Sequence, residues 1–114
     1  MNRNEAELMA WTMIVENDLL GWTFDWDRAK NRLGQCNFSK KTITLSKFFV
    51  DSARREEVEQ TMFHEIAHAL LPTNIGHSEL WRIQARILGY TGARTSAWGT
   101  ENQQVHVFDF APSN

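Results

Sequence analysis

Apolar side chains recur three or four positions apart near the start of the chain, the spacing that places them on one face of a helix. These side chains are Leu8, Trp11, Val15 and Leu19. Acidic residues lie on the other side, and Gly21 supplies a stop signal after the last apolar position. The pattern predicts an amphipathic helix over residues 5–20 that buries these four side chains.

The spacing changes to strict alternation in "WTFDWD", where aromatic residues alternate with threonine and aspartate. A period of two is typical of a half-buried strand. The stretches "RLGQCNF" and "KTITLS" predict two further short strands, joined by a turn near Asn37–Lys40. Gly34, inside the second strand, indicates a bulge or a close approach of another backbone. The three strands are predicted to form an antiparallel meander.

Helical spacing returns after residue 50. Asp51 and Ser52 are favourable N-cap residues, and Pro72 closes the apolar run. The apolar stripe consists of Val58, Met62, Ile66 and Leu70. A separate face of the same predicted helix carries Thr61, His64, Glu65 and His68.

These elements predict an α+β fold: an N-terminal helix, a three-stranded antiparallel sheet, a helix that carries "HEIAH", and one further helix. A chain of 114 residues is the size of a single domain. We place that domain at residues 1–98 and a C-terminal tail, with a candidate strand, at residues 99–114.

Charge, cysteine content and hydropathy exclude several classes of protein. The net charge of −2 provides no global basic field. Cys36 is single, so an internal disulfide is impossible and a reducing compartment is indicated. Acidic residues occupy the place of a signal peptide's apolar run, and no apolar stretch is long enough for a membrane span. We therefore expect a cytoplasmic protein with no membrane partner.

One stretch departs from this balance of charge. Six basic residues and no acidic residue occur between positions 28 and 50. Such a run is either the solvated face of a hairpin or a surface for an anionic partner. On the second interpretation we expect weak binding of single-stranded DNA through Lys30, Arg32, Lys40 and Lys41.

The stretch "HEIAH" has the spacing of a metal site with a general base. Histidines four residues apart stand one above the other on a helix, so His64 and His68 can reach a single ion. Glu65 is turned by one residue, beside the ion's open position, where it can accept a proton from water. The alternative is a metal-free polar cluster, which is costly because each buried group then needs its own partner.

A catalytic zinc ion takes three protein ligands, so a third residue must follow the helix. Leu71 and Asn74 occupy the positions where the metzincin pattern requires glycine and histidine, which excludes that class. His77 fits best, because "LPTNIG" contains a proline and a glycine that let the chain reverse. Glu79 remains the alternative third ligand. His106, in the strand-like "QQVHVFDF", is predicted not to bind metal.

Three segments together resemble the SprT-like zinc metalloprotease family, which includes Spartan: "RLGQCNFSKKTITLSKFFV", "TMFHEIAHAL" and "GHSELWRIQARILGYTGAR". The resemblance spans roughly residues 5–95, and its most specific part is H-E-x-x-H followed by a Gly-His pair and Trp81. The family's functional residues correspond to His64, His68 and His77 as zinc ligands and to Glu65 as the catalytic glutamate.

The resemblance implies a minimal gluzincin-like fold, one Zn²⁺ ion per chain, and hydrolysis of protein or peptide substrates, including proteins trapped on DNA. The alternative function is a zinc-stabilised adaptor or DNA-binding module without catalysis. Glu65 favours the protease, because holding zinc requires only the ligands. Many members continue into a cysteine zinc ribbon, and the absence of cysteine after Cys36 implies that this ribbon is missing. Tyr90 is either a core residue or a hydrogen-bond donor to the transition state.

Overall fold

The computed structural model describes residues 1–73 and 76–92. The predicted tail at 99–114 and His106 therefore lie outside the described residues. The elements, in chain order, are α1 (Arg3–Glu16), β1 (Thr23–Asp27), β2 (Gly34–Asn37), β3 (Thr42–Ser46), α2 (Lys47–Ser52), α3 (Arg55–Ala69) and α4 (Glu79–Leu88). This order confirms the predicted α+β class. Within the described ranges, no helix has the length and apolar character needed to cross a bilayer.

The three strands form one mixed sheet in the order β1-β3-β2. β2 and β3 are antiparallel, as predicted, but β1 runs parallel to β3, so the prediction of an antiparallel meander is wrong on this point. β3 takes the central position because Ile43 and Leu45 are fully buried and need neighbours on both sides. The six residues between β1 and β2 can cross the two strand spacings of about 10 Å that this order requires.

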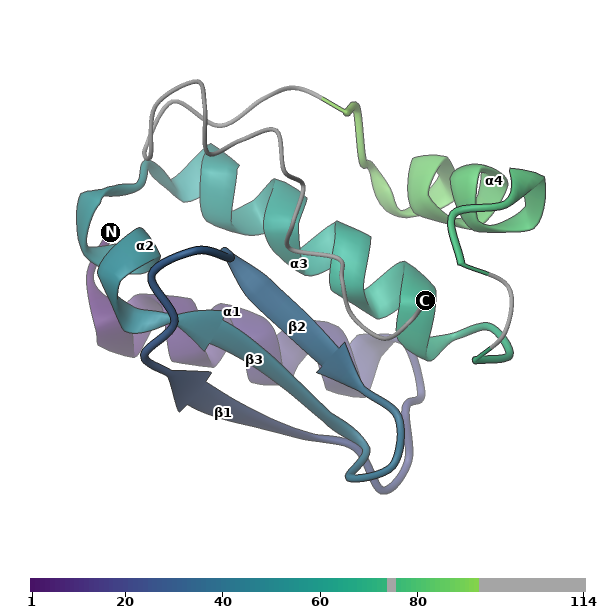
Figure 1. The fold of residues 1–114 in the computed structure, drawn as a ribbon, viewed down its shortest axis with the longest axis horizontal. Coiled ribbons are helices and arrows are strands. Elements are labelled where there is room, and N and C mark those ends of the chain that lie inside the picture. The colour runs from purple at the N-terminus through teal and green to yellow at the C-terminus, as the bar shows by residue number, and fades with distance from the viewer. Residues whose placement is uncertain (74–75, 93–114) are drawn as a thin grey trace.

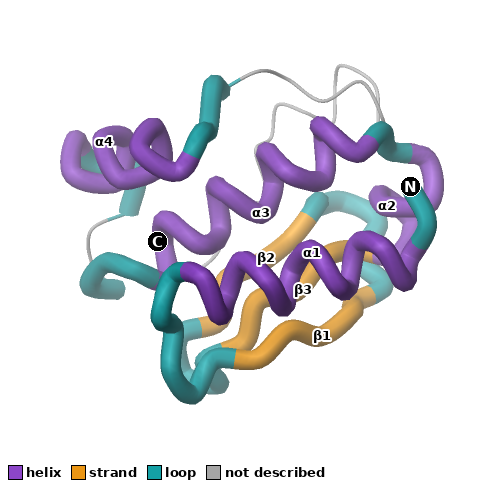
Figure 2. The backbone as a smooth tube through the Cα atoms, turned by 180° about the vertical axis from the view of Figure 1, so that it is seen from behind, coloured by secondary structure: helices purple, strands orange, loops and turns teal. Residues whose placement is uncertain are grey.

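Among the described residues, the helices cover one face of the sheet and leave the other face open. α1 and α3 both pack against the strands from the same side, and α4 packs on α3 away from the sheet (Figure 1, Figure 2). The open face is polar: the hydroxyl of Thr44 donates a hydrogen bond of 2.6 Å to Asp27, which also pairs with Arg32 at 3.3 Å. The histidine-bearing helix is therefore the middle layer, with the sheet on one side and α4 on the other.

The face that α1 buries differs from the prediction. The buried side chains are Ala6, Met9, Ala10 and Ile14. Leu8 and Val15 of the predicted stripe are about 70% exposed, at 69% and 70%. The chain carries two apolar stripes on this helix, and the one with two alanines is buried because small side chains let the helix approach its neighbours closely. Spacing alone could not distinguish the two stripes.

The predicted start of the histidine-bearing helix is also wrong. Asp51 and Ser52, the predicted N-caps, lie instead in the short helix α2. An extended Ala53 separates α2 from α3, which begins at Arg55. The carboxylate of Glu57 accepts a hydrogen bond of 2.9 Å from the backbone N–H of Arg54. Neither glycine nor proline marks this break, so the sequence provided no signal for it.

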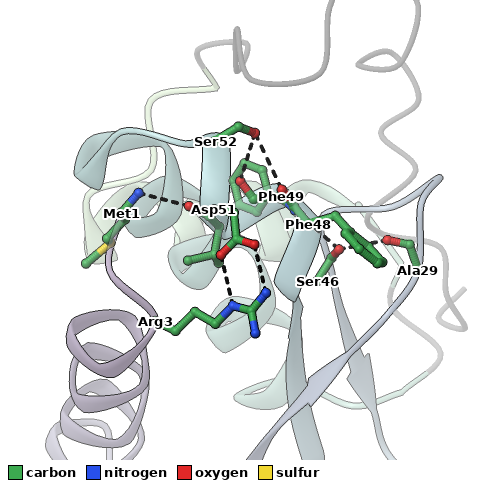
Figure 3. Close-up of polar contacts among 9 residues, drawn as sticks. Met1, Arg3, Ala29, Ser46, Phe48, Phe49, Asp51 and Ser52 are labelled. Carbon is green, nitrogen blue, oxygen red and sulfur yellow. Dashed lines mark hydrogen bonds and ion pairs between the residues drawn. The ribbon is translucent and has the colours of Figure 1, made fainter.

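Figure 3 shows how α2 is attached to the rest of the chain. The Arg3 guanidinium donates two hydrogen bonds to Asp51, of 2.9 and 2.7 Å, and thereby lowers the pKa of that carboxyl. Ser46 caps α2 by accepting from the backbone N–H of Phe49, and its hydroxyl donates to the carbonyl of Ala29 at 2.7 Å. These contacts fix the connection through which the sheet leads into α3.

Gly34 permits the close approach that the sequence indicated. A Cβ atom at this position would lie 2.8 Å from the Thr44 carbonyl oxygen and 3.2 Å from Cγ2 of Thr61 on α3. Those distances are shorter than ordinary van der Waals contacts. The absence of a side chain therefore lets β2 lie directly against the helix that carries the histidines.

Candidate metal centre

Three histidines converge at the C-terminal half of α3. His64 and His68 lie one turn apart on this helix and are both buried, whereas His77 precedes α4 and is exposed. The Nε2 atom of His77 lies 3.0 Å from Nε2 of His68 and 3.2 Å from Nε2 of His64. The predicted loop reversal after Pro72 therefore brings the third imidazole to the other two.

The spacing of the three nitrogen atoms suits a tetrahedral metal ion. Zn–N bonds of ~2.0–2.1 Å at tetrahedral angles place the ligand nitrogens about 3.3–3.4 Å apart. The observed separations of 3.0 and 3.2 Å approach this value closely. Among the residues that the structure describes, these histidines form the one group of metal-binding side chains close enough to share an ion.

The alternative ligand, Glu79, does not join this group. It is exposed in the first turn of α4, and its carboxylate lies 3.7 Å from the guanidinium of Arg82. The geometry thus favours His77 over Glu79 as the third member of the site.

The surroundings of His68 favour its neutral form. Burial, and secondly the proximity of His77, lower the pKa of His68 to about 3. Burial has this effect because it disfavours the charged imidazolium. A neutral imidazole is the form that coordinates a metal, so the fold prepares this side chain for an ion.

Glu65 is fully buried on α3, the helix that packs against β2. Glu65 interacts electrostatically with Cys36 of β2. Burial raises the pKa of the Cys36 thiol, and the negative charge of Glu65 raises it further, to a lesser extent. The sequence alone did not predict that Cys36 lies near Glu65. The alternation along β2 does indicate which way Cys36 faces, because Gly34 and Cys36 both point toward the helix side of the sheet.

Two aromatic residues from beyond the histidines enclose His64. Trp81 is buried, donates a hydrogen bond of 3.4 Å from Nε1 to the His64 carbonyl, and has its ring centroid 4.7 Å from the imidazole. The ring of Tyr90 lies 5.5 Å from that of His64. Tyr90 thus lies beside the candidate metal site. The sequence alone left the position of Tyr90, in the core or at the site, undecided.

A pocket of about 350 Å³ lies along β2. It is lined by residues 35–39 of β2 and the following turn, together with Thr73 after α3. Cys36, which interacts electrostatically with Glu65, belongs to this lining. Apart from Cys36 and Phe38, the lining side chains are polar and uncharged.

The four basic residues proposed for nucleic acid are not brought together. Lys30 and Arg32 precede β2, whereas Lys40 and Lys41 lie in the turn that follows it, at the other end of the strand (Figure 1). Arg32 is paired with Asp27, and the ammonium of Lys30 lies 5.2 Å from the centre of the Phe48 ring. The stretch therefore forms two separate basic groups rather than one face.

Comparison with known proteins agrees with this geometry. The SprT-like family profile matches residues 6–105, and no curated protein sequence matches the chain. The chain therefore belongs to the SprT-like family, which is related to metalloproteases. Membership of this family implies that the protein binds a metal ion.

Proposed function

We propose that this member of the SprT-like family is a zinc-dependent metallopeptidase that hydrolyses peptide bonds in protein substrates. The observation that carries the proposal is the convergence of three imidazole Nε2 atoms beside a fully buried glutamate. Membership of a metalloprotease-related family supports the same chemistry.

His64, His68 and His77 would hold the ion through their Nε2 atoms. When bound, zinc lowers the pKa of a coordinated water toward ~7 and polarises the scissile carbonyl. The Glu65 carboxylate takes the proton from the attacking water and then delivers it to the departing amide nitrogen. Burial of Glu65 keeps this carboxylate away from bulk solvent.

The position of the pocket supports an extended peptide as substrate. Among the described residues, β2 is an edge strand, because it pairs with β3 on one side and with no strand on the other. An extended chain can add to such an edge through main-chain hydrogen bonds. Because the pocket lies along β2, a peptide added to this edge could place side chains in it.

The test separates a peptidase from a zinc-stabilised adaptor. Purified protein carrying one zinc ion per chain is incubated with an unfolded protein, and new amino termini are identified by mass spectrometry. A peptidase produces new termini that disappear after chelation of the metal and return when zinc is restored. Zinc-loaded protein that binds the unfolded chain without cleaving it would establish the adaptor function instead.

Contact with nucleic acid would extend the proposal to DNA-associated substrates. We expect weak binding of single-stranded DNA, in the range of ~10⁻⁴–10⁻⁶ M, that weakens steeply with salt. Replacing Lys30, Arg32, Lys40 and Lys41 with glutamine should abolish it.

The separation of the two basic groups refines this prediction. The double replacement of Lys40 and Lys41 should account for most of the loss, because Asp27 already neutralises Arg32. Zinc content serves as the control and should not change. Binding that is independent of salt, or that survives all four substitutions, would refute a DNA-contacting surface here.

A further inference from the structure

Gln60 of α3 makes three hydrogen bonds to the segment that follows α4. Nε2 of Gln60 donates a hydrogen bond of 3.1 Å to the Gly89 carbonyl. Its Oε1 atom accepts two hydrogen bonds from Thr91, of 2.8 Å from the backbone N–H and 3.2 Å from the hydroxyl. One amide group thus holds the residues on both sides of Tyr90.

The backbone at Gly89 fixes the direction in which this segment leaves α4. Gly89 ends the helix with a positive φ of 117°, and a Cβ atom there would lie 3.0 Å from the Phe63 ring. The backbone N–H of Tyr90 then donates to the Ala85 carbonyl at 2.9 Å. Residues 89–91 are therefore anchored to both helices.

The anchored segment places Tyr90 against a metal ligand. The centroid of the Tyr90 ring lies 5.5 Å from the centroid of the His64 imidazole and 5.6 Å from that of the Trp81 ring. The ring centroid of Trp81 lies 4.7 Å from that of the same imidazole. Gln60 precedes His64 by four residues, so the anchor and the ligand lie on one face of α3, one turn apart.

We propose that Gln60 is a positioning residue for the metal site: by holding Tyr90 in place, it keeps the His64 imidazole in the orientation that binds the ion. The inference rests on the metal site of the proposed function. Residues that orient a ligand change metal affinity by ~10–100-fold when they are removed. Without the Gln60 amide, the Tyr90 ring can withdraw and His64 gains rotational freedom.

The test measures zinc affinity by competition with a chelator, well below the unfolding temperature. Gln60→Ala should weaken zinc binding by about tenfold, and it should change the visible spectrum of the cobalt(II)-substituted protein, which reports ligand geometry. Glu56→Ala, an exposed substitution one turn earlier on α3, is the matched control and should change neither.

Two further variants examine the route through Tyr90. Tyr90→Phe keeps the ring and should bind zinc as the wild type does, whereas Tyr90→Ala should resemble Gln60→Ala. If both residues act through the same contact, the double variant Gln60→Ala/Tyr90→Ala should bind no more weakly than Tyr90→Ala alone. Gln60→Glu keeps the acceptor for Thr91 but loses the donor to Gly89, so it should give a smaller loss. It also replaces Gln60→Ala if that variant does not fold.

Unchanged zinc affinity and an unchanged cobalt spectrum in Gln60→Ala would overturn the inference, even if its unfolding temperature fell. Fully additive losses in the double variant would likewise overturn the route through Tyr90. These outcomes leave the proposed function standing, since the wild type would still bind zinc. A wild type that binds no zinc would refute the proposed function itself.

Discussion

Glu65→Gln should reduce peptide-bond hydrolysis by at least ~10²-fold, the lower end of what a general base contributes. Glutamine preserves the size and the hydrogen-bonding acceptor of the side chain but cannot take a proton from water. Glu65 is fully buried, so a substitute of equal size is needed to leave the packing of α3 unchanged. The measurement is the initial rate of cleavage of an unfolded protein, at equal zinc content for both proteins.

Glu79→Gln is the matched control for this substitution. It removes a carboxylate just beyond the third histidine, where Glu79 is exposed and outside the group that converges on the ion. Hydrolysis should remain near the wild-type rate. If Glu65→Gln retained full activity with zinc bound, Glu65 could not be the general base.

His77→Ala should reduce the zinc content from one ion per chain to a small fraction after dialysis. His77 provides one of the three converging nitrogen atoms. Catalytic zinc sites use three protein ligands, so the two imidazoles that remain should hold the ion poorly. His77 is exposed, whereas His64 and His68 are buried. Its removal therefore tests the ligand set with the least disturbance of the core.

Metal analysis of His77→Ala should be run beside His106→Ala. His106 is predicted not to be a ligand, so its replacement should leave the zinc content unchanged. Equal zinc retention in the two variants would contradict the three-histidine site and direct attention back to Glu79.

The candidate site was largely predictable because its features are local. Two histidines four residues apart share a helix face in any α-helix, and Pro72 and Gly76 allow a short reversal toward His77. The structure confirms that these three imidazoles converge. Val58, Met62 and Ile66 of the predicted stripe are buried, because they share the helical period of the histidines, whereas Leu70, the fourth member, is half-buried.

The features that were missed depend on contacts between distant segments. The parallel pairing of β1 with β3 follows from which strand is most deeply buried, and sequence order does not reveal that. The electrostatic interaction between Cys36 and Glu65 joins residues 29 positions apart, and Gln60 forms hydrogen bonds with Thr91 across 31 positions. Alternation along β2 places Cys36 on the helix side of the sheet but does not identify Glu65, and no periodic pattern links Gln60 to Thr91.

The most direct test of the central claim is a zinc titration of the metal-free protein, with hydrolysis followed at each step. The proposed mechanism predicts that the cleavage rate of an unfolded protein rises in proportion to bound zinc and levels off at one ion per chain. A rate that stays at the level of the metal-free protein after one zinc ion has bound would contradict the account.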